Sequence, residues 1–262
     1  MPSDPVLIEK DGGVVTLTLN RPDVRNAMNV ELTEAFVQAV RGLRDDAEVR
    51  AVIVTGAGTA FCAGGDLSWI KPGPDADVPA MRRKMREFYP KFLAVRDLAV
   101  PTIAAINGHA VGAGLCLALA CDVRYASTEA RLSAPFTRLG MHPGMAATYL
   151  LTRLIGTARA ADLLFTSRAV DAGEAERMGL INRAVAGDEL LATARQTAVQ
   201  IAANAPIPME MTKRAIYLAE RADMETMLEY EGMAQPITLA TSDLLEGLAS
   251  VKEKRAPRFE GR

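Results

Sequence analysis

The chain has 262 residues, 49% of them hydrophobic and 24% charged, which suits one large folded domain or a domain with a small appendage and gives no sign of disorder. Its formal net charge of -2 argues against a nucleic-acid partner, because such proteins carry an excess of basic residues. The three cysteines form an odd set without a CxxC pair or metal-ligand spacing, which predicts no metal site and favours a reducing, cytoplasmic compartment.

Strand and helix patterns alternate through the first part of the chain. Val14–Leu19 is β-branched and alternating, which predicts a strand, and a helix capped by Asn29 is predicted to follow, with apolar residues at helical spacing as far as Leu43. Two wholly apolar segments, Ala51–Thr55 and Thr102–Ile106, are typical of strands covered on both faces. Each of these two strands leads into a glycine-bearing turn.

A further helix is predicted to begin near Gly112 and to end before Asp122, with a strand after it at Val123–Ala126. The most apolar stretch, Val111–Cys121, would reach roughly 17 Å as a helix, too short to cross a bilayer, so we expect no membrane partner. Strand, turn and helix recur at intervals of roughly 40–50 residues, which predicts a stacked α/β core over residues 6–190.

From Asp188 onward the pattern is helical. The predicted helices are Leu190–Ala203, Ile207–Ala219 and Met224–Leu248. They carry too few large apolar residues to form a core of their own, so we expect them to pack on the first part of the chain or on another subunit.

The Trp69–Tyr89 segment interrupts this rhythm. Its Lys71-Pro72-Gly73-Pro74-Asp75 sequence is incompatible with regular structure, which predicts a loop that is either a lid or a disordered insert. The segment directly follows a glycine-rich motif, and that position favours the lid.

Two glycine-rich motifs are candidates for binding a ligand through the main chain. They are Phe61-Cys62-Ala63-Gly64-Gly65-Asp66-Leu67 and Asn107-Gly108-His109-Ala110-Val111-Gly112-Ala113-Gly114. Neither matches the dinucleotide fingerprint, and the chain has no phosphate loop and no GxSxG nucleophile elbow. If Gly112–Gly114 begins a helix, its unpaired amides suit a developing negative charge, and a second amide near Gly65 would complete a two-donor oxyanion hole. The alternative is that both motifs only permit tight turns and close helix packing.

Together, several motifs in a fixed order resemble the crotonase (enoyl-CoA hydratase/isomerase) superfamily, over nearly the whole chain. The motifs are Leu19-Asn20-Arg21-Pro22, Arg25-Asn26-Ala27-Met28-Asn29, Val54-Thr55-Gly56-Ala57-Gly58, Ala60–Leu67, Pro101–Gly108, Ala120-Cys121-Asp122, Leu139–Gly144 and Lys254–Phe259. The resemblance implies an α/β fold built as a spiral of ββα repeats over residues 1–190. It also implies a helical trimerisation region over residues 191–262, which packs on the core and on neighbouring subunits of a homotrimer or dimer of trimers.

The resemblance also implies that the substrate is an acyl-CoA thioester, with coenzyme A entering as part of the substrate and no permanently bound cofactor. The amides of Gly65 and Ala113 would hold the thioester oxygen. Arg25, Ala63, Asp66 and Leu67 would lie along the nucleotide and pantetheine. At Asp66 the contact would come from the main chain, and the side chain is alternatively a helix cap.

Two positions depart from the hydratase pattern. Hydratases of this family use two glutamates, and the matching positions here are Cys116 and Phe136, the latter directly after Pro135. Phenylalanine cannot exchange a proton, so water addition by the paired-carboxylate route is not expected. The acyl end of the pocket is expected to be apolar and to contain Cys116, Phe136, Met141, Gly144 and Met145.

Other side chains are candidates for moving a proton. His142 is a candidate general base, because imidazole titrates near neutral pH, and its alternative is a hydrogen-bonded or solvated turn residue. Cys116 is a candidate proton carrier or a small buried side chain. Tyr89 is expected to reach in from the predicted lid or to pack against it. Strand alternation is expected to send Thr137 and Arg138 to the face opposite Phe136, which favours surface or interface roles for both.

Three functions remain open from the sequence. The first is an enzyme that processes acyl- or enoyl-CoA by isomerisation or another proton-transfer reaction. The second is a protein that binds or carries acyl-CoA without turnover, and the third is an acyl-CoA thioester hydrolase. The enzyme and the carrier differ in whether a titratable side chain faces the acyl carbons beyond Gly65 and Ala113.

Overall fold

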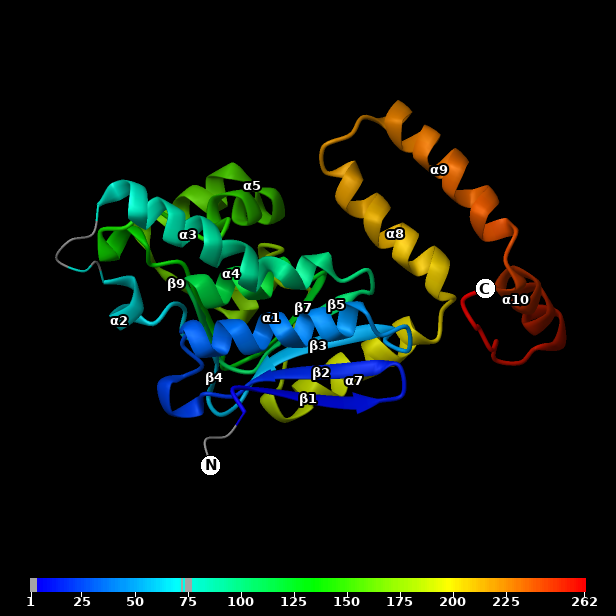
Figure 1. The fold of residues 1–262 in the computed structure, drawn as a ribbon, viewed down its shortest axis with the longest axis horizontal. Helices are drawn as coiled ribbons and strands as arrows, with labels where there is room; N and C mark the ends of the chain where they lie inside the picture. Colours follow the sequence, from blue (N-terminus) through cyan, green and yellow to red (C-terminus); the bar gives the residue numbers. More distant parts are fainter. Residues whose placement is uncertain (1–3, 72, 74–76) are drawn as a thin grey trace.

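The computed structural model describes residues 4–71, 73 and 77–262. Within them, one sheet of six strands has the spatial order β1-β2-β3-β5-β7-β10 (Figure 1). Only β1 and β2 pair antiparallel, and every later neighbour is parallel. The strands are β1 (Val6–Asp11), β2 (Val14–Leu19), β3 (Ala51–Gly56), β5 (Thr102–Ile106), β7 (Val123–Ser127) and β10 (Arg183–Val185).

A second sheet of four short strands stands beside the first, in the order β4-β6-β8-β9. Its strands are β4 (Ala60–Cys62), β6 (His109–Val111), β8 (Arg131–Ser133) and β9 (Ala169–Asp171). The long strands β3, β5 and β7 each lead through a turn into a short strand, β4, β6 and β8 in that order, so the recurring unit is ββα. The patterns of the residues themselves predict only one strand in each unit. The spiral of ββα repeats that the family resemblance implies is confirmed.

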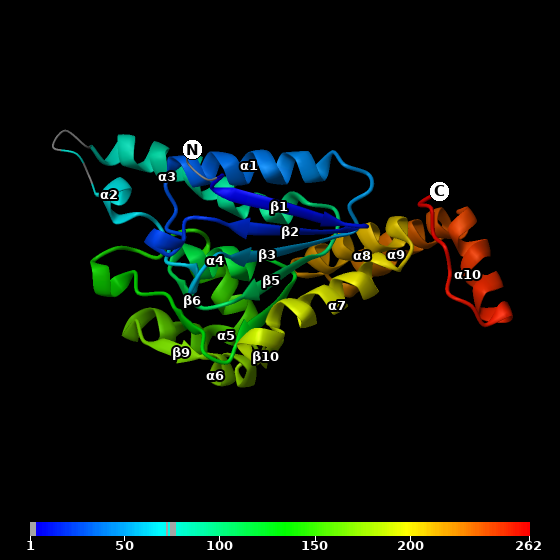
Figure 2. The same cartoon turned by 90° about the horizontal axis from the view of Figure 1, so that it is seen from below.

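Alternating side chains of the large sheet fill two separate cores, as expected for strands covered on both faces. Val52 and Val54 belong to the core under α1 (Val30–Arg44) and α4 (Ala113–Ala120). Ala51 and Ile53 belong to the core under α7 (Leu190–Ala202). Figure 2 shows α1 and α7 on opposite sides of the strands. The helix that covers the second face is therefore the first one of the expected C-terminal region.

Most predicted elements are confirmed to within a few residues, and the exceptions include one helix and one loop. The capped helix is α1, where the Asn29 side chain accepts a hydrogen bond from the Leu32 amide at 2.9 Å. Met224–Leu248 was expected as one helix, but Thr241 caps a new helix, so the segment is divided. The remaining helices are α2 (Leu67–Ile70), α3 (Val78–Leu93), α5 (Ala147–Thr166), α6 (Ala172–Arg177), α8 (Pro206–Ala219), α9 (Met224–Leu239) and α10 (Ser242–Glu253).

The second wrong prediction concerns the irregular loop expected over Trp69–Tyr89, because helix α3 begins at Val78 and includes Tyr89. Asp77 caps this helix by accepting from the Ala80 amide. Buried aromatic side chains then fix α3 on α1, with Phe92 stacked on Phe36 at 5.2 Å between ring centroids. Pro72, Pro74 and Asp75 of the expected loop lie outside the described residues.

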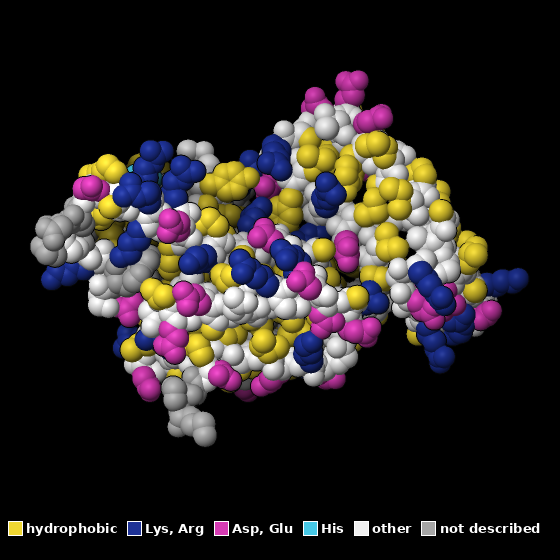
Figure 3. Space-filling model, in the orientation of Figure 1, with side chains coloured by type: hydrophobic (Ala, Val, Ile, Leu, Met, Phe, Trp, Pro, Cys, Tyr) yellow, Lys and Arg dark blue, Asp and Glu magenta, His cyan; other side chains and the backbone are white. Residues whose placement is uncertain are grey.

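The last three helices project beyond the two sheets as an arm (Figures 1 and 2). An ion pair between buried Lys213 and partly buried Asp122 joins α8 to the end of the large sheet. The Lys213 ammonium lies 2.8 Å from an Asp122 carboxylate oxygen and donates to the Val100 carbonyl. Hydrophobic side chains gather on the surface of the arm (Figure 3). Those that stand exposed on it are Ile216, Met224, Leu228, Met233, Ile237, Leu239, Leu245, Leu248 and Val251.

No helix in the described part of the chain combines the length and the apolar character that a bilayer span requires.

Candidate active site

The two glycine-rich motifs meet because β4 and β6 are parallel neighbours, with Ala60 opposite His109 and Cys62 opposite Ala110. The segments that follow both strands therefore leave the small sheet at the same edge. Gly64 lies so close to the second motif that a Cβ there would come 2.7 Å from the Val111 oxygen and 3.5 Å from the Ala113 nitrogen. Its φ of 95° is also a conformation that favours glycine.

A buried asparagine joins a third segment to this edge. Asn26 is fully buried, and its side-chain amide donates to the carbonyls of Ala57 at 3.0 Å and Ala60 at 2.8 Å. Met28, two residues further on, forms a parallel bridge with Gly65. Asn26 was not singled out from its residue pattern; its φ of 56°, which asparagine tolerates better than most residues, explains the asparagine at this point of the motif.

Among the described residues, the amides of Gly65 and Ala113 have no main-chain hydrogen-bond acceptor, and local geometry explains why. In the bridge, Met28 donates to Gly64 and accepts from Asp66, so the N–H of Gly65 points to the other side. Ala113 is the first residue of α4, where an N–H has no acceptor within the helix. Two such donors beside one cavity are able to bind a single oxygen that carries negative charge.

Both amides adjoin a cavity of about 120 Å³ between the glycine motifs, α3 and the segment before α5. Among the described residues that line it there is no aspartate or glutamate, and the titratable side chains are Tyr89 and His142. The lining residues are Ala63, Gly64, Gly65, Leu67, Ile70, Met85, Phe88, Tyr89, Val111, Gly112, Ala113, Pro135, Phe136, Leu139, Met141, His142, Gly144 and Met145.

The structure brings together most of the predicted site residues. Ala63, Leu67, Phe136, Met141, Gly144 and Met145 all line the cavity with the two amides. Arg25 is exposed outside the described lining, and its carbonyl accepts from the Ala63 amide at 2.9 Å. Asp66 caps α2 by accepting from the Ser68 amide at 3.0 Å, so its side chain acts as the helix cap.

His142 is exposed at the mouth of the cavity. Its Nδ1 lies 2.8 Å from the Pro143 carbonyl oxygen. A carbonyl only accepts hydrogen bonds, so in the neutral ring Nδ1 carries the hydrogen and Nε2 keeps its lone pair. The hydrogen bond therefore leaves the basic nitrogen available.

Phe136 lines the cavity, but the segment after it is not a strand. Residues Thr137–Leu139 form a 3₁₀ turn, so the expected strand alternation does not apply. The Thr137 side chain is instead held away from the cavity by a hydrogen bond that its hydroxyl donates to the Leu164 carbonyl at 2.7 Å.

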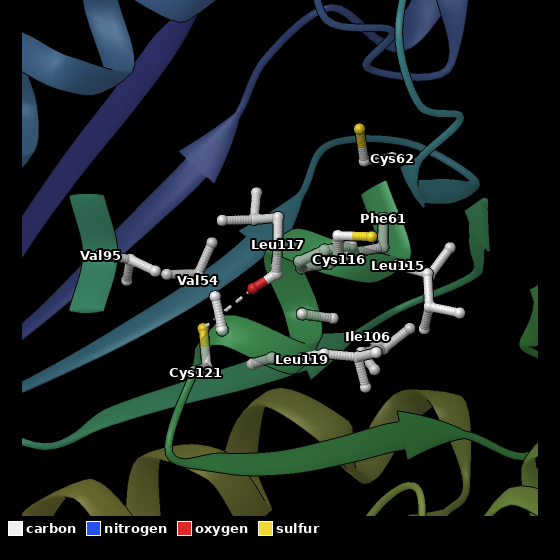
Figure 4. Close-up of a cluster of buried hydrophobic side chains, with 14 of the residues drawn as sticks. Val54, Phe61, Cys62, Val95, Ile106, Leu115, Cys116, Leu117, Leu119 and Cys121 are labelled. Carbon is white, nitrogen blue, oxygen red and sulfur yellow. Dashed lines mark hydrogen bonds between the residues drawn. The ribbon is translucent and has the colours of Figure 1, made fainter. Parts of the chain in front are cut away.

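Cys116 is expected in the acyl pocket, but it is not among the described residues that line the cavity. Every residue of α4 is buried, and Cys116 lies among apolar side chains with the thiols of Cys62 and Cys121 (Figure 4). Its Sγ is 3.8 Å from the Gly144 carbonyl oxygen. Burial raises the pKa of the Cys116 thiol to about 12, so the thiol stays protonated near neutral pH.

Burial also raises the pKa of Cys62 and Cys121 to about 12. The free energy of unfolding therefore depends on pH in the alkaline range. In the unfolded chain the thiols lose their protons near pH 9, whereas the folded chain retains them. We therefore expect the free energy of unfolding to be unaffected by the thiols below pH 9 and to fall between pH 9 and 12, by about 1.4 kcal/mol per pH unit for each thiol. Urea unfolding at several pH values measures this slope, and Cys121→Ala should reduce it. An unchanged slope in that variant would contradict the prediction.

Several cavity residues were not singled out from the sequence, namely Ile70, Met85, Phe88 and Leu139. Met85 and Phe88 come from α3, whose helical form was missed. Their apolar character alone does not distinguish them from core residues. In the described part of the chain, no group of three or more histidine, cysteine, aspartate or glutamate residues could hold a metal ion.

The fold and the cavity can be compared with known proteins. The family model described as enoyl-CoA hydratase/isomerase matches residues 9–262, and the chain belongs to this family. It is 38% identical over 262 residues, all of both chains, to the Mycobacterium tuberculosis protein named "Probable enoyl-CoA hydratase echA8". It is 37% identical over 258 residues to the short-chain-enoyl-CoA hydratase of Clostridium acetobutylicum, covering 98% of this chain and 97% of that one.

A solved structure agrees with these sequence matches. The crystal structure of enoyl-CoA hydratase from Bacillus anthracis has a TM-score of 0.93 and 36% identity, covering 98% of this chain and 100% of that chain. The family resemblance inferred from the motifs is therefore confirmed.

Proposed function

We propose that this chain is an enzyme that binds acyl- or enoyl-CoA thioesters and stabilises a thioester enolate between the amides of Gly65 and Ala113. The observation that carries the proposal is that both unpaired donors adjoin one cavity whose other walls are mostly apolar. An enolate places negative charge on the thioester oxygen, where two fixed donors stabilise it most. Relatives named enoyl-CoA hydratases support CoA thioesters as the substrate class.

The reaction that we propose is isomerisation of a double bond, or another proton transfer, in place of hydration by two glutamates. By resemblance to the family, Cys116 and Phe136 occupy the glutamate positions. Cys116 is a protonated buried thiol and Phe136 has no exchangeable proton. Isomerisation needs one proton removed and one returned, so it does not require a carboxylate pair that positions water.

The base in this proposal is His142, through Nε2. We expect His142→Ala to lower kcat by about 10²-fold while the Kd for acyl-CoA changes little, because general-base catalysis is lost and the amides remain. Steady-state kinetics and thioester binding are the measurements. His109→Ala is the matched control, since His109 is exposed on β6 and lies outside the described lining of the cavity. Wild-type kinetics in the His142 variant would remove His142 from the mechanism.

The proposed function is tested with purified protein and a panel of acyl-, 2-enoyl- and 3-enoyl-CoAs, following conjugated-enoyl absorbance and free thiol. A rise in absorbance with a 3-enoyl-CoA shows isomerisation and supports the proposal. Loss of absorbance with a 2-enoyl-CoA, without thiol release, shows hydration and contradicts the proposed reaction. Release of thiol shows a hydrolase. Tight binding without any change shows a carrier, and it would contradict the proposed enzyme.

For the quaternary structure we propose a homotrimer or a dimer of trimers, built through the arm of α8, α9 and α10. The support is the run of exposed apolar side chains on these helices (Figure 3). A patch of this kind is typical of a surface that a partner subunit covers. Sedimentation measures the mass directly, and a monomer would contradict this assembly.

A further inference from the structure

Tyr89 brings a hydroxyl to the wall of the cavity beside the first of the two altered glutamate positions. Gly144 connects the two side chains. A Cβ on Gly144 would lie 2.6 Å from the Tyr89 Oη, so the hydroxyl is in contact with this glycine. The carbonyl of the same glycine faces the Cys116 Sγ at 3.8 Å. The phenol therefore stands next to the place that a glutamate of α4 would occupy.

The position of Tyr89 is fixed by α3 and not by a flexible loop. Phe88 packs edge-on against Tyr89 with 6.4 Å between ring centroids, and it also packs on Phe92 at 5.9 Å. Phe92 in turn stacks on Phe36 of α1. This row of aromatic side chains anchors the helix that carries the phenol, and a fixed helix is the kind of support that a group in proton transfer requires.

The Tyr89 hydroxyl has no hydrogen-bond partner among the described residues, although its ring is half-buried in the cavity wall. A half-buried hydroxyl without a protein partner is available to a bound ligand. Gly144 leaves room for it, because any larger residue there would occupy the space of the oxygen.

We propose that Tyr89 donates the proton that returns to the acyl chain of the thioester, in the place of the absent carboxylic acid. This role rests on the proposed function, because it requires an enolate held by Gly65 and Ala113. It extends that function by separating the acid from the base, which is His142.

The protons and electrons of this step balance. The base removes a proton from the α-carbon, and the electron pair of the broken C–H bond forms the enolate. A new C–H bond then forms at the γ-carbon as the O–H bond of Tyr89 breaks, and the thioester carbonyl re-forms. The electron pair of the O–H bond stays on the phenolate, which regains its proton from water, while His142 releases the proton that it took.

Burial raises the pKa of Tyr89, with a smaller contribution in the same direction from the neighbouring Cys116. The hydroxyl therefore stays protonated near neutral pH. It is suited to act as the acid and not as the base of the reaction, since a group that has lost its proton cannot donate one.

The experiment uses a 3-enoyl-CoA with the full-length protein in D₂O and follows two readouts. Conjugated-enoyl absorbance reports isomerisation, and NMR reports exchange of the α-proton for deuterium. Tyr89→Phe keeps the ring and removes only the hydroxyl. We expect isomerisation to fall about 10²-fold while α-exchange continues at the wild-type rate and KM changes by less than about twofold. Gly144→Ala, which displaces the hydroxyl, should likewise lower isomerisation and leave α-exchange at the wild-type rate.

Tyr125→Phe is the matched control, because its hydroxyl bonds to Thr197 at 3.1 Å between β7 and α7, away from the cavity. It should leave both readouts unchanged. If Tyr89→Phe isomerises as fast as the wild type, the role of Tyr89 is wrong and the proposed function stands. If the folded variant loses exchange as well as isomerisation, Tyr89 is not the specific acid. If the wild type itself neither exchanges nor turns over any thioester, the proposed function fails first.

Discussion

We expect Ala113→Pro to lower kcat/KM by about 10³-fold or more in a folded protein. Proline has no N–H, so it removes one of the two donors, which by itself costs about 10²–10³-fold in comparable sites. The proline ring also occupies the space that the thioester oxygen would take. The helix should survive, because Ala113 is the first residue of α4, the position where proline is best tolerated, and the preceding Gly112 is conformationally permissive.

Val30→Pro is the matched control for this variant. Val30 is the first residue of α1 and 50% exposed, and it follows the extended residue Asn29, so proline should fit there without effect on activity. Far-UV circular dichroism verifies folding, and the kinetics and Kd for an acyl-CoA are compared in both variants. If the Ala113 variant is folded and keeps both its rate and its affinity, the assignment of this amide as an oxyanion donor is wrong.

The second large effect is expected on stability. Gly114→Ala should lower the free energy of unfolding by about 3 kcal/mol or more, because overpacked cores lose about 1–3 kcal/mol even where side chains can move. Here the new Cβ would come 2.2 Å from the Cys62 carbonyl oxygen and 2.7 Å from its Cβ. Cys62 ends β4, whose backbone is held by pairing with β6, so it has little freedom to retreat.

Gly42→Ala provides a control of the same chemistry with the opposite expected sign. Gly42 is exposed within α1, and no atom lies within 4 Å of an added Cβ. Removing a glycine from a helix interior should raise stability by about 0.5–1 kcal/mol. Urea unfolding of both variants is the measurement. Equal midpoints for the two proteins would show that the contact between α4 and β4 is looser than the structure indicates.

Close contact between α4 and β4 also links stability to the site. Gly114 follows Ala113 directly, and Cys62 precedes Ala63 and Gly64. A methyl group between them would separate the two amides before it reached any ligand. We therefore expect the activity of the Gly114 variant to fall even below its unfolding temperature, as kinetics at 10 °C and 25 °C would show.

Residue patterns predicted the elements whose signals are local. Three such signals lie within single segments and predicted elements that are present: the alternation of Val14–Leu19, the cap at Asn29 and the apolar run Thr102–Ile106. The start of α4 was predicted in the same way, from glycines that precede an apolar run. The start of α4 also places the candidate amide of Ala113 at a helix N-terminus.

The strands of the small sheet could not be predicted from such patterns. β4, β6 and β8 have three residues each, too few to show alternation, and they exist because strands distant in sequence pair with them. Helix α3 was missed for a related reason. Its cap at Asp77 follows a proline-rich segment, and its stability comes from aromatic packing on α1.

The sequence by itself determined the family, through motifs in a fixed order, and the alternation of long strands and helices, because motif order and apolar periodicity are properties of neighbouring residues. Only the tertiary structure decided which side chains face the ligand. α4 is buried on all sides, so no periodicity reveals that the Cys116 Sγ lies 3.8 Å from the Gly144 carbonyl oxygen. Tyr89 reaches the same glycine from a helix 55 residues earlier in the chain, a contact that depends on how α3 packs on α1.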